Sequence, residues 1–350
     1  MDDGRRAAPR PLTAGREHVV PTLDEVARLA GVSRSTASRA INRGPRVSAA
    51  TRAAVDAAVT ELGFTPNRAA RSLVTRRTDS IALVVPEPDE RVLSDPFFAG
   101  TISGLTAALS ASDLQLVLVL ARPTEVATRT LRYLRNGHVD GAVVVSHHRG
   151  DALAVELERS GLPSVFIGRP LSGPRAEYVD VDNVAGGRLA TDHLIRSGRR
   201  RIATVTGPLD MSAGVDRLRG WHDALADAGL PRDAVASGDF TTRGGARAAR
   251  ELLDRHRDLD AVFVASDLMA VGALGVLADA GLDVPGDVAV VGYDNAALAA
   301  SASPPLTTVA SPVASMARAA GELLVSRLTG SAPCVSPVIL SPDLVVRASA

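Results

Sequence analysis

The chain has 350 residues, 46% of them hydrophobic, so it is long enough to form two or three domains with sizeable cores. It has no run of about 18 apolar residues and a single cysteine, Cys334, so we expect no membrane span, no internal disulfide and a cytoplasmic protein. The formal net charge is zero, yet residues 1–78 carry 14 Arg and 7 acidic side chains, and the remainder is acidic. A basic N-terminal part on an acidic body suggests that the first part contacts a polyanion.

The first twenty residues differ in composition from the helical stretch that follows them. Residues 1–20 are rich in Arg, Pro and Gly and lack the apolar core of a secretory signal, so we expect a disordered tail. Residues 21–64 contain three short helical patterns. The first begins at Thr22, which is spaced to form a capping box with Glu25, and its apolar residues recur every three or four positions.

The second helical pattern follows a turn at Gly31 and a Ser33 that can cap it. It covers Arg34–Ile41 and leaves these cationic and hydroxyl side chains exposed: Arg34, Ser35, Thr36, Ser38 and Arg39. A third helix is expected from a Ser48 cap to Leu62. Two short helices joined by a Gly turn are typical of a helix-turn-helix that reads DNA, because Arg can bond a guanine edge and hydroxyls can bond phosphates. The alternative is an ordinary three-helix bundle with a polar face.

Longer stretches of this region match a known pattern. They are Thr22–Ser33, Ser35–Asn42, Val47–Ser48, Thr51–Arg52, Leu62–Phe64, Pro66–Asn67 and Ala70–Leu73. Through them the chain resembles the lactose-repressor/galactose-repressor family of transcription regulators, and the similarity covers essentially the whole chain after residue 20. Ala37 departs from the family, which usually has Val there, and the smaller side chain should loosen the packing slightly.

The resemblance implies which residues contact double-stranded DNA. Arg34, Ser35 and Arg39 occupy positions that read the major groove, and residues 67–74 match a hinge helix that folds when two protomers bind a palindromic operator. Leu73 matches a Leu that wedges into a central base step, which costs unstacking energy and gains wrapped contact. The full set of expected DNA contacts is Thr22, Ser33, Arg34, Ser35, Thr36, Ser38, Arg39, Asn42, Asn67, Ala70 and Leu73.

After a polar connector at residues 65–79, short apolar stretches alternate with amphipathic ones, which is the pattern of parallel sheets built from βαβ units. The predicted strands are Ile81–Val85, Gln115–Leu120, Gly141–Val145, Ser164–Ile167, Arg201–Thr206, Ala261–Ala265 and Val288–Gly292. We therefore predict an α/β fold over residues 80–350, with two such sheets rather than one.

The family's sensor resembles periplasmic sugar-binding proteins, in which two doubly wound subdomains enclose a ligand cleft. The resemblance places subdomain 1 at about 80–180 and 311–337, and subdomain 2 at about 181–310 and 338–350.

Residues that match the family's ligand positions follow strands, at the edge where open α/β sheets bind ligands. Arg217 and Asp294 match positions that grip ligand hydroxyls or ring nitrogens, since a guanidinium donates hydrogen bonds and a carboxylate accepts them. Phe240 matches an aromatic platform. The resemblance adds Asp95, Phe97 and Phe98 on one wall, Arg169 on a second wall, and the neighbouring pair Ser266 and Asp267.

Two of these assignments leave alternatives open. Relatives often carry an amide at the position of Ser266, so its contact is undetermined, and Asp267 is equally placed to cap the helix that begins after it. Purine-sensing relatives have polar groups near two positions where this chain has Met211 and Ala213, which favours a sugar over a purine.

Two other classes of protein compete with a regulator. For an enzyme, the sequence lacks a nucleophile elbow, a phosphate-binding loop and a clustered Cys/His metal site, so we expect no cofactor or metal. A periplasmic transport receptor would share the sensor domain but not the helix-turn-helix.

We expect a homodimer, because a palindromic operator needs two DNA-binding domains related by twofold symmetry. A tetramer formed through a C-terminal heptad-repeat helix is not expected, because Pro333, Pro337 and Pro342 oppose such a helix. The resemblance implies that an effector changes DNA binding through a change in the cleft. The sequence does not give the sign of this effect, and we favour release because most sugar-sensing relatives are released by their ligand.

Overall fold

The computed structural model describes residues 21–65, 77–121, 129–172, 176–330 and 337–350. The chain forms two compact units, Met1–Arg76 and Arg77–Ala350. The expected tail over residues 1–20 and most of the expected hinge lie outside the described residues.

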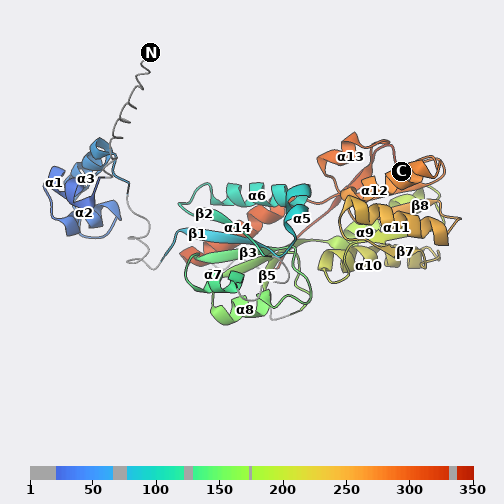
Figure 1. Ribbon diagram of the computed structural model, residues 1–350, viewed down its shortest axis with the longest axis horizontal. Helices are drawn as coiled ribbons and strands as arrows, with labels where there is room; N and C mark the ends of the chain where they lie inside the picture. The colour runs from blue at the N-terminus through green and yellow to red at the C-terminus, as the bar shows by residue number, and fades with distance from the viewer. Residues whose placement is uncertain (1–20, 66–76, 122–128, 173–175, 331–336) are drawn as a thin grey trace, which may run out of the picture. The chain divides into compact units, whose positions relative to one another are not determined.

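In its described residues, 21–65, the first unit is a bundle of three helices, as predicted (Figure 1). Their bounds are α1 Leu23–Leu29, α2 Arg34–Ile41 and α3 Ala49–Leu62. Both halves of the Thr22–Glu25 capping box form, and Ser33 caps α2 by accepting a hydrogen bond from the Thr36 backbone. The α3 helix ends at Gly63, whose φ of 62° is the left-handed conformation that glycine adopts without strain. The core consists of small apolar side chains: Val26, Ala27, Ala37, Ala40, Val55 and Ala58.

The second unit contains two sheets, each of six strands in the described residues. The first has the order β11-β5-β4-β3-β1-β2, and all of its pairs are parallel. Its strands are β1 Ser80–Val85, β2 Gln115–Leu120, β3 Gly141–Val145, β4 Ser164–Ile167, β5 Glu177–Val181 and β11 Val338–Leu340. Its helices are α5 Asp89–Ser94, α6 Pro96–Leu109, α7 Leu131–Arg135, α8 Leu153–Ser160 and α14 Val313–Thr329.

Successive residues of β1 point to opposite faces of the sheet and pack into two separate hydrophobic cores, as expected for a sheet covered by helices on both faces. Ile81 and Leu83 pack with residues of α6 and α14 on one face. Ala82 and Val84 pack with residues of α7 and α8 on the other (Figure 1).

The second sheet has the order β12-β10-β9-β8-β6-β7, in which only β12 is antiparallel to its neighbour. Its strands are β6 Ile202–Thr206, β7 Val235–Ser237, β8 Ala261–Val264, β9 Ala289–Asp294, β10 Thr307–Ala310 and β12 Asp343–Val345. Its helices are α9 Asn183–Arg196, α10 Ser212–Asp227, α11 Thr242–Arg255, α12 Asp267–Asp279 and α13 Ala297–Ser301. The core between α11, α12 and this sheet is separate from the core beneath α9 and α10.

The C-terminal strands divide differently from our expectation. We expected residues 338–350 in the second subdomain, yet Val338 pairs with Val179 of β5, so β11 completes the first sheet. Only β12 joins the second sheet, beside β10. The sequence could predict two short strands here but not their partners, because sheet membership depends on contacts with residues far away in the chain.

None of the described helices combines the length and apolar composition needed to cross a membrane.

Candidate functional site

The exposed face of α2 carries the predicted DNA-reading side chains. Arg34, Ser35 and Arg39 are all exposed. The Arg39 Nε donates to the Ser35 carbonyl oxygen at 3.2 Å, and its Nη2 lies 3.5 Å from Thr36 Oγ1. The Arg34 Nε is 3.6 Å from a carboxylate oxygen of Asp24, and both side chains are solvated. Such solvated contacts are worth little, so both guanidiniums can exchange them for phosphates or base edges.

The hydroxyl and amide groups of the same face form hydrogen bonds with one another and with the backbone of α2. The Ser33 hydroxyl lies 3.0 Å from that of Ser35 and 2.9 Å from that of Thr36. The Asn42 Nδ2 donates to the Ser38 carbonyl oxygen at 2.9 Å. These bonds fix the first turn and the last turn of α2, so the polar face has a defined shape before any DNA is present. Of the remaining expected DNA contacts, Thr22 caps α1, while Asn67, Ala70 and Leu73 lie outside the described residues.

A cavity in the second unit lies at the carboxyl ends of the parallel strands. The space at this site that no protein atom fills, open solvent included, is about 700 Å³. Six of the nine predicted ligand residues line it: Asp95, Phe97, Arg217, Phe240, Ser266 and Asp294. They come from α6, α10, the β7–α11 loop, the start of α12 and the end of β9, so both sheets contribute.

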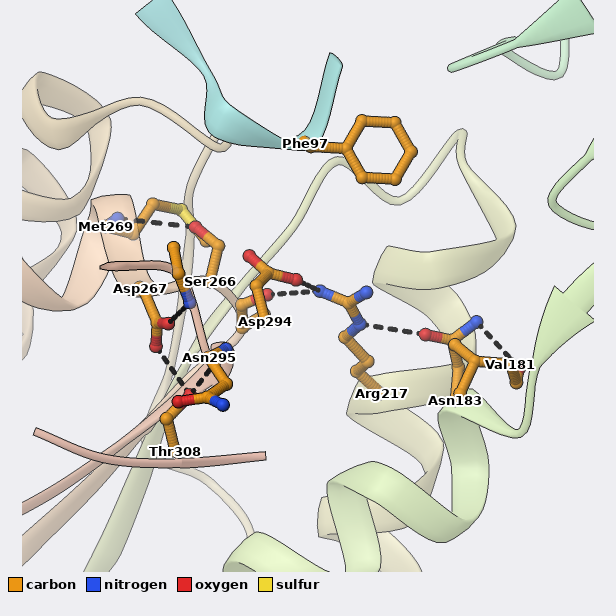
Figure 2. A network of polar contacts seen from close by, with 12 residues as sticks. Phe97, Val181, Asn183, Arg217, Ser266, Asp267, Met269, Asp294, Asn295 and Thr308 are labelled. Atoms are coloured by element: carbon orange, nitrogen blue, oxygen red, sulfur yellow. Dashed lines mark hydrogen bonds and ion pairs between the residues drawn. The ribbon is translucent and has the colours of Figure 1, made fainter. Parts of the chain in front are cut away.

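Arg217 is the central side chain of this cavity (Figure 2). It extends from α10 and is almost fully buried. Its Nε donates to Asn183 Oδ1 at 2.9 Å, and its Nη1 donates to the Ala265 carbonyl oxygen at 2.6 Å and lies 3.5 Å from Asp294 Oδ1. The guanidinium stacks 3.6 Å above the centre of the Tyr293 ring. These contacts orient a donor fork whose Nη2 donates none of the hydrogen bonds that Arg217 makes to the described residues.

The carboxyl groups in the cavity are held in environments that disfavour their charge. Burial raises the pKa of Asp294 well above its ordinary value, and the nearby Arg217 opposes this rise. Burial also raises the pKa of Asp95, partly offset by a hydrogen bond from the Phe97 backbone. The backbone of Asp294 has a φ of 109°, outside the usual range for a residue with a side chain, and such strain is common at binding sites.

An aromatic ring covers one side of the cavity. Phe240 has a left-handed φ of 61° and lies within 6 Å of two guanidiniums, those of Arg91 at 5.3 Å and Arg217 at 5.8 Å. Its ring rests directly on Gly207, where a Cβ would lie 2.2 Å from the ring. Glycine is thus required at residue 207 for the ring to occupy this place. The ring is almost fully buried, and the part of it that lines the cavity can contact a flat apolar ligand surface.

Three of the predicted ligand residues do not line the cavity. Phe98 is part of the core of the first sheet, and Arg169 forms an ion pair with Asp216 at 2.6 Å. Asp267 is buried and accepts hydrogen bonds from Thr308 Oγ1 at 2.6 Å and the Ala296 backbone at 2.8 Å (Figure 2).

The structure shows which residue caps α12, the role that we had considered for Asp267. The Ser266 hydroxyl, not the Asp267 carboxylate, caps α12 by accepting a 3.3 Å hydrogen bond from the Met269 backbone. Capping by Asp267 was therefore the wrong alternative, because the extended backbone of Ser266 makes it the residue before the first turn. Burial raises the pKa of Asp267 to about 6, and its bonds tie α12 to β10.

Several lining residues were not predicted from the sequence. Arg91, Asp180 and Asn183 line the cavity, as do Ser146 and His147. Asp180 and Asn183 carried a usable signal, because polar side chains at the end of a strand often bind ligands, but we did not predict β5 and so did not notice it. Arg91 lies in a charged segment that resembles an exposed helix, and no local feature indicated that it would be buried.

Two charged contacts join the two sheet-containing halves beside the cavity. His148 follows β3, and its ring nitrogens lie 3.1 Å from Glu87 Oε1 and 2.9 Å from Asp210 Oδ2. The hydrogen bond with Glu87, together with that to Asp210, raises the pKa of His148 to about 9 against the opposing effect of burial. Arg169, paired with Asp216 of α10, forms the second contact. Because Asp210 and Asp216 belong to the second half, both contacts favour a closed cleft.

Within the part of the chain that the structure describes, no group of three or more His, Cys, Asp or Glu side chains could hold a metal ion. The arrangement around Arg217 is suited to binding a polar, uncharged molecule.

Both units of the chain are similar to known protein families. Residues 22–67 match the family model of bacterial regulatory proteins of the lacI family, and residues 191–350 match that of a periplasmic binding protein-like domain. The HTH-type transcriptional regulator CelR of Thermobifida fusca is 50% identical over 333 residues, which is 94% of this chain and 98% of that protein.

Two solved structures are similar over almost the same extent. A transcriptional regulator CelR–cellobiose complex has 48% sequence identity and a TM-score of 0.76, and the match covers 94% of this chain and 100% of that one. A lac repressor dimer bound to operator and the anti-inducer ONPF has 28% identity and a TM-score of 0.82, with 94% and 99% covered.

Proposed function

This chain belongs to the lacI family of bacterial regulatory proteins and is a DNA-binding transcriptional regulator, and we propose that it acts as a repressor. In this proposal a dimer binds a palindromic operator, and a sugar releases the dimer from it. The observation that carries the effector half of the proposal is the cavity around Arg217, with its donor fork, its acceptors and its aromatic wall.

The DNA half of the proposal rests on α2. Its exposed Arg34 and Arg39 flank hydroxyl groups that are fixed by local hydrogen bonds. A single such helix covers one half-site, and a twofold dimer presents two helices to a palindrome. We propose in addition that Leu73 acts as the minor-groove wedge, which predicts that Leu73→Ala reduces operator bending while effector affinity remains unchanged.

An apolar edge of the first sheet supports the dimer. β2 lies at the end of that sheet, and its Leu118 and Leu120 are 44% and 39% exposed, with Ile102 of α6 36% exposed. Exposed apolar edge strands favour pairing with another chain, so a second copy is the expected cover. The similarity to a lac repressor solved as a dimer is consistent with this assignment.

The chemistry of the cavity favours a neutral sugar. A sugar presents hydroxyls that both donate and accept, and the cavity offers the Arg217 guanidinium as donor and the carboxyl groups of Asp95 and Asp294 as acceptors. The Phe240 ring provides an apolar surface for the C–H face of a pyranose. Met211 and Ala213 line the same cavity, so the positions that would favour a purine lack polar groups.

The effector controls DNA binding if it binds the two states of the protein with different affinity. The cavity is lined from both sheet-containing halves, so a bound sugar changes the equilibrium between open and closed clefts. A coupling of about 1–3 kcal/mol changes operator affinity roughly 5–150-fold.

The test starts by selecting operator sequences from a random duplex library with the full chain. The selected sequence is expected to be a palindrome, and cellobiose, the sugar in the similar CelR complex, is expected to weaken its binding in a fluorescence anisotropy titration. Hypoxanthine serves as the purine control. Selection of no preferred sequence, or release by hypoxanthine but by none of a panel of sugars, would contradict the proposal.

A further inference from the structure

His148 joins the two sheet-containing halves and does not line the cavity around Arg217. Its Nε2 lies 3.1 Å from Glu87 Oε1 of its own half, and its Nδ1 lies 2.9 Å from Asp210 Oδ2 of the other half. We propose that these three residues form a proton-dependent latch, in which the protonated His148 ring holds the cleft closed, so that closure and sugar affinity both decrease as the pH rises. The effect on sugar affinity rests on the proposed function, whereas the latch itself does not.

The positions of the two ring nitrogens indicate the charged form of His148. A neutral imidazole has one N–H and one lone pair, so it can donate to only one carboxylate. Each ring nitrogen of His148 has a carboxylate oxygen within hydrogen-bonding distance, and only the doubly protonated ring can donate to both. The hydrogen bond with Glu87, together with that to Asp210, raises the pKa of His148 to about 9 against the opposing effect of burial. One proton therefore links a group of the first half to a group of the second.

Glu87 is the fixed side of the latch. Its carboxylate is buried, accepts a hydrogen bond from Ser146 Oγ at 2.6 Å and pairs with Arg91 of α5. Against the effect of burial, the hydrogen bond from His148 and the charge of Arg91 lower the pKa of Glu87. These partners all belong to the first half, so Glu87 stays charged and stays beside His148 when the cleft opens.

Asp210 is the partner that opening of the cleft removes. It lies in the loop between β6 and α10, and its side chain is 54% exposed. Its backbone carbonyl oxygen accepts a 2.7 Å hydrogen bond from the Arg149 N–H, so two hydrogen bonds join the same two loops across the cleft. When the halves separate, His148 loses one of its two carboxylates and its pKa falls. Protonation therefore favours closure, and this contribution is lost as the pH rises through about 9.

Other charged groups near His148 cannot produce the same dependence on pH. Asp151 lies in the same loop and accepts a 2.7 Å hydrogen bond from the His148 backbone, so it accompanies His148 in both states of the cleft. Burial lowers the pKa of the neighbouring His147 below its ordinary value of 6.5, so that ring is neutral at higher pH. The pair of Arg169 with Asp216 also spans the cleft, but a guanidinium keeps its charge throughout this range.

The latch is tested first without a sugar. The Arg149 N–H bonds across the cleft, so its protection from hydrogen exchange, measured by NMR on the full-length protein at about pH 7.5, reports closure. Protection should fall at least threefold in His148→Gln and in Asp210→Asn. His222→Gln is the matched control and should keep parental protection, because His222 lies 3.6 Å from the Asp223 carboxylate within one half. Parental protection in both latch variants would overturn the latch.

The link to the sugar is tested by calorimetry with cellobiose in buffers of different ionisation enthalpy, which counts the protons bound on association. At about pH 8.5 the parent and His222→Gln should each take up about 0.3 proton or more beyond the uptake of His148→Gln and Asp210→Asn. The cellobiose affinity of the parent should fall at least threefold between about pH 7.5 and 9.5, and by less at high salt, which screens the half-exposed Asp210.

Two outcomes separate the latch from the proposed function. Equal proton uptake in the parent and both latch variants would overturn the link between His148 and sugar affinity, and would leave the sugar-responsive repressor standing. A parent that binds no sugar but is released from its operator by another molecule would overturn the proposed function, while the protection of the Arg149 amide would still decide the latch.

Discussion

Replacing Arg217 with Met tests whether one side chain both organises the cavity and stabilises the second unit. Met preserves most of the aliphatic length of Arg217 but removes its hydrogen bonds to Asn183 and Ala265 and its 3.5 Å contact with Asp294. The Asn183 amide and the Ala265 carbonyl then lose a buried partner, and Asp294 loses its nearby positive charge.

The magnitude follows from these losses. A buried hydrogen bond to a charged group contributes about 1.5–3 kcal/mol, and breaking a buried ion pair from one side costs about 3–5 kcal/mol. These contributions overlap, and Asp294, whose burial already raises its pKa, can take up a proton and reduce the loss. We therefore expect Arg217→Met to lower the free energy of unfolding of this unit by about 3–5 kcal/mol. Cellobiose affinity should fall below detection.

Chemical denaturation followed by tryptophan fluorescence measures the stability change, since Trp221 is buried in the same unit. Arg219→Met is the matched control: Arg219 lies on the same helix, is 70% exposed and faces only Asp223 at 3.5 Å, so its loss should cost less than about 1 kcal/mol. Asp294→Asn in the Arg217→Met chain should recover part of the stability. A loss below about 1 kcal/mol in Arg217→Met, or sugar binding at parental affinity, would refute the role that we assign to Arg217.

Three further predictions concern the DNA contact, the charged contact across the cleft and the assembly. Arg39→Ala should weaken operator binding by about 1–3 kcal/mol in anisotropy titrations, and equal affinity of variant and parent would argue against base contact. Because the pKa of His148 is raised to about 9, its pairing with Glu87 and Asp210 stabilises the fold fully below about pH 6.5, and this stabilisation is lost as the pH rises through 9. Denaturation between pH 7 and 10 should thus show a smaller loss of stability in His148→Gln than in the parent; identical slopes would contradict this reasoning. Sedimentation should give about twice the chain mass of 36.2 kDa, and Leu118→Arg should shift the protein toward monomer, whereas a stable species of four chains would require another interface.

The three described helices of the first unit could be predicted from sequence because their determinants are local. The capping box at Thr22, the cap at Ser33 and the turn at Gly63 each involve residues within a few positions of one another. The apolar pattern then decides which faces meet. No contact between residues distant in sequence is needed to predict these three helices.

The strands of the second unit were harder to predict for different reasons. β7 has only three residues, and Glu177–Val181 mixes polar and apolar side chains because its first residues are only half-buried. β10 was not among the predicted strands. The alternation of strands and helices indicated the fold class, but it could not indicate which sheet receives β11.

Some of the candidate binding residues could be identified from the sequence and others could not. Arg217 and Asp294 could be located by resemblance, and the structure brings them together. Arg91 and His148 could not be located, because their burial results from contact between halves of the fold that are distant in sequence. Asp267 shows the converse: its neighbours in sequence indicated a site residue, yet its bonds to Thr308 and Ala296 serve the packing of α12.

The cavity's position between the two halves sets a thermodynamic requirement on regulation. Arg91 and Asp95 approach it from the half that contains the first sheet, while Arg217 and Phe240 approach it from the half that contains the second. Sugar affinity therefore depends on how far the cleft is closed, and operator affinity must depend on the same closure.

Binding free energies at two coupled sites are reciprocal, so a sugar that weakens operator binding by some factor must itself bind the operator complex more weakly by the same factor. Calorimetric titration of cellobiose into the free protein and into its operator complex, compared with operator titrations at zero and saturating cellobiose, measures both factors. Equal factors of roughly 5–150 would fit a single equilibrium between two cleft states. If operator affinity changed with cellobiose while the measured cellobiose affinity was the same with and without operator, the site that calorimetry detects would not be the site that controls operator binding. The cavity between the two halves would then not be the regulatory site.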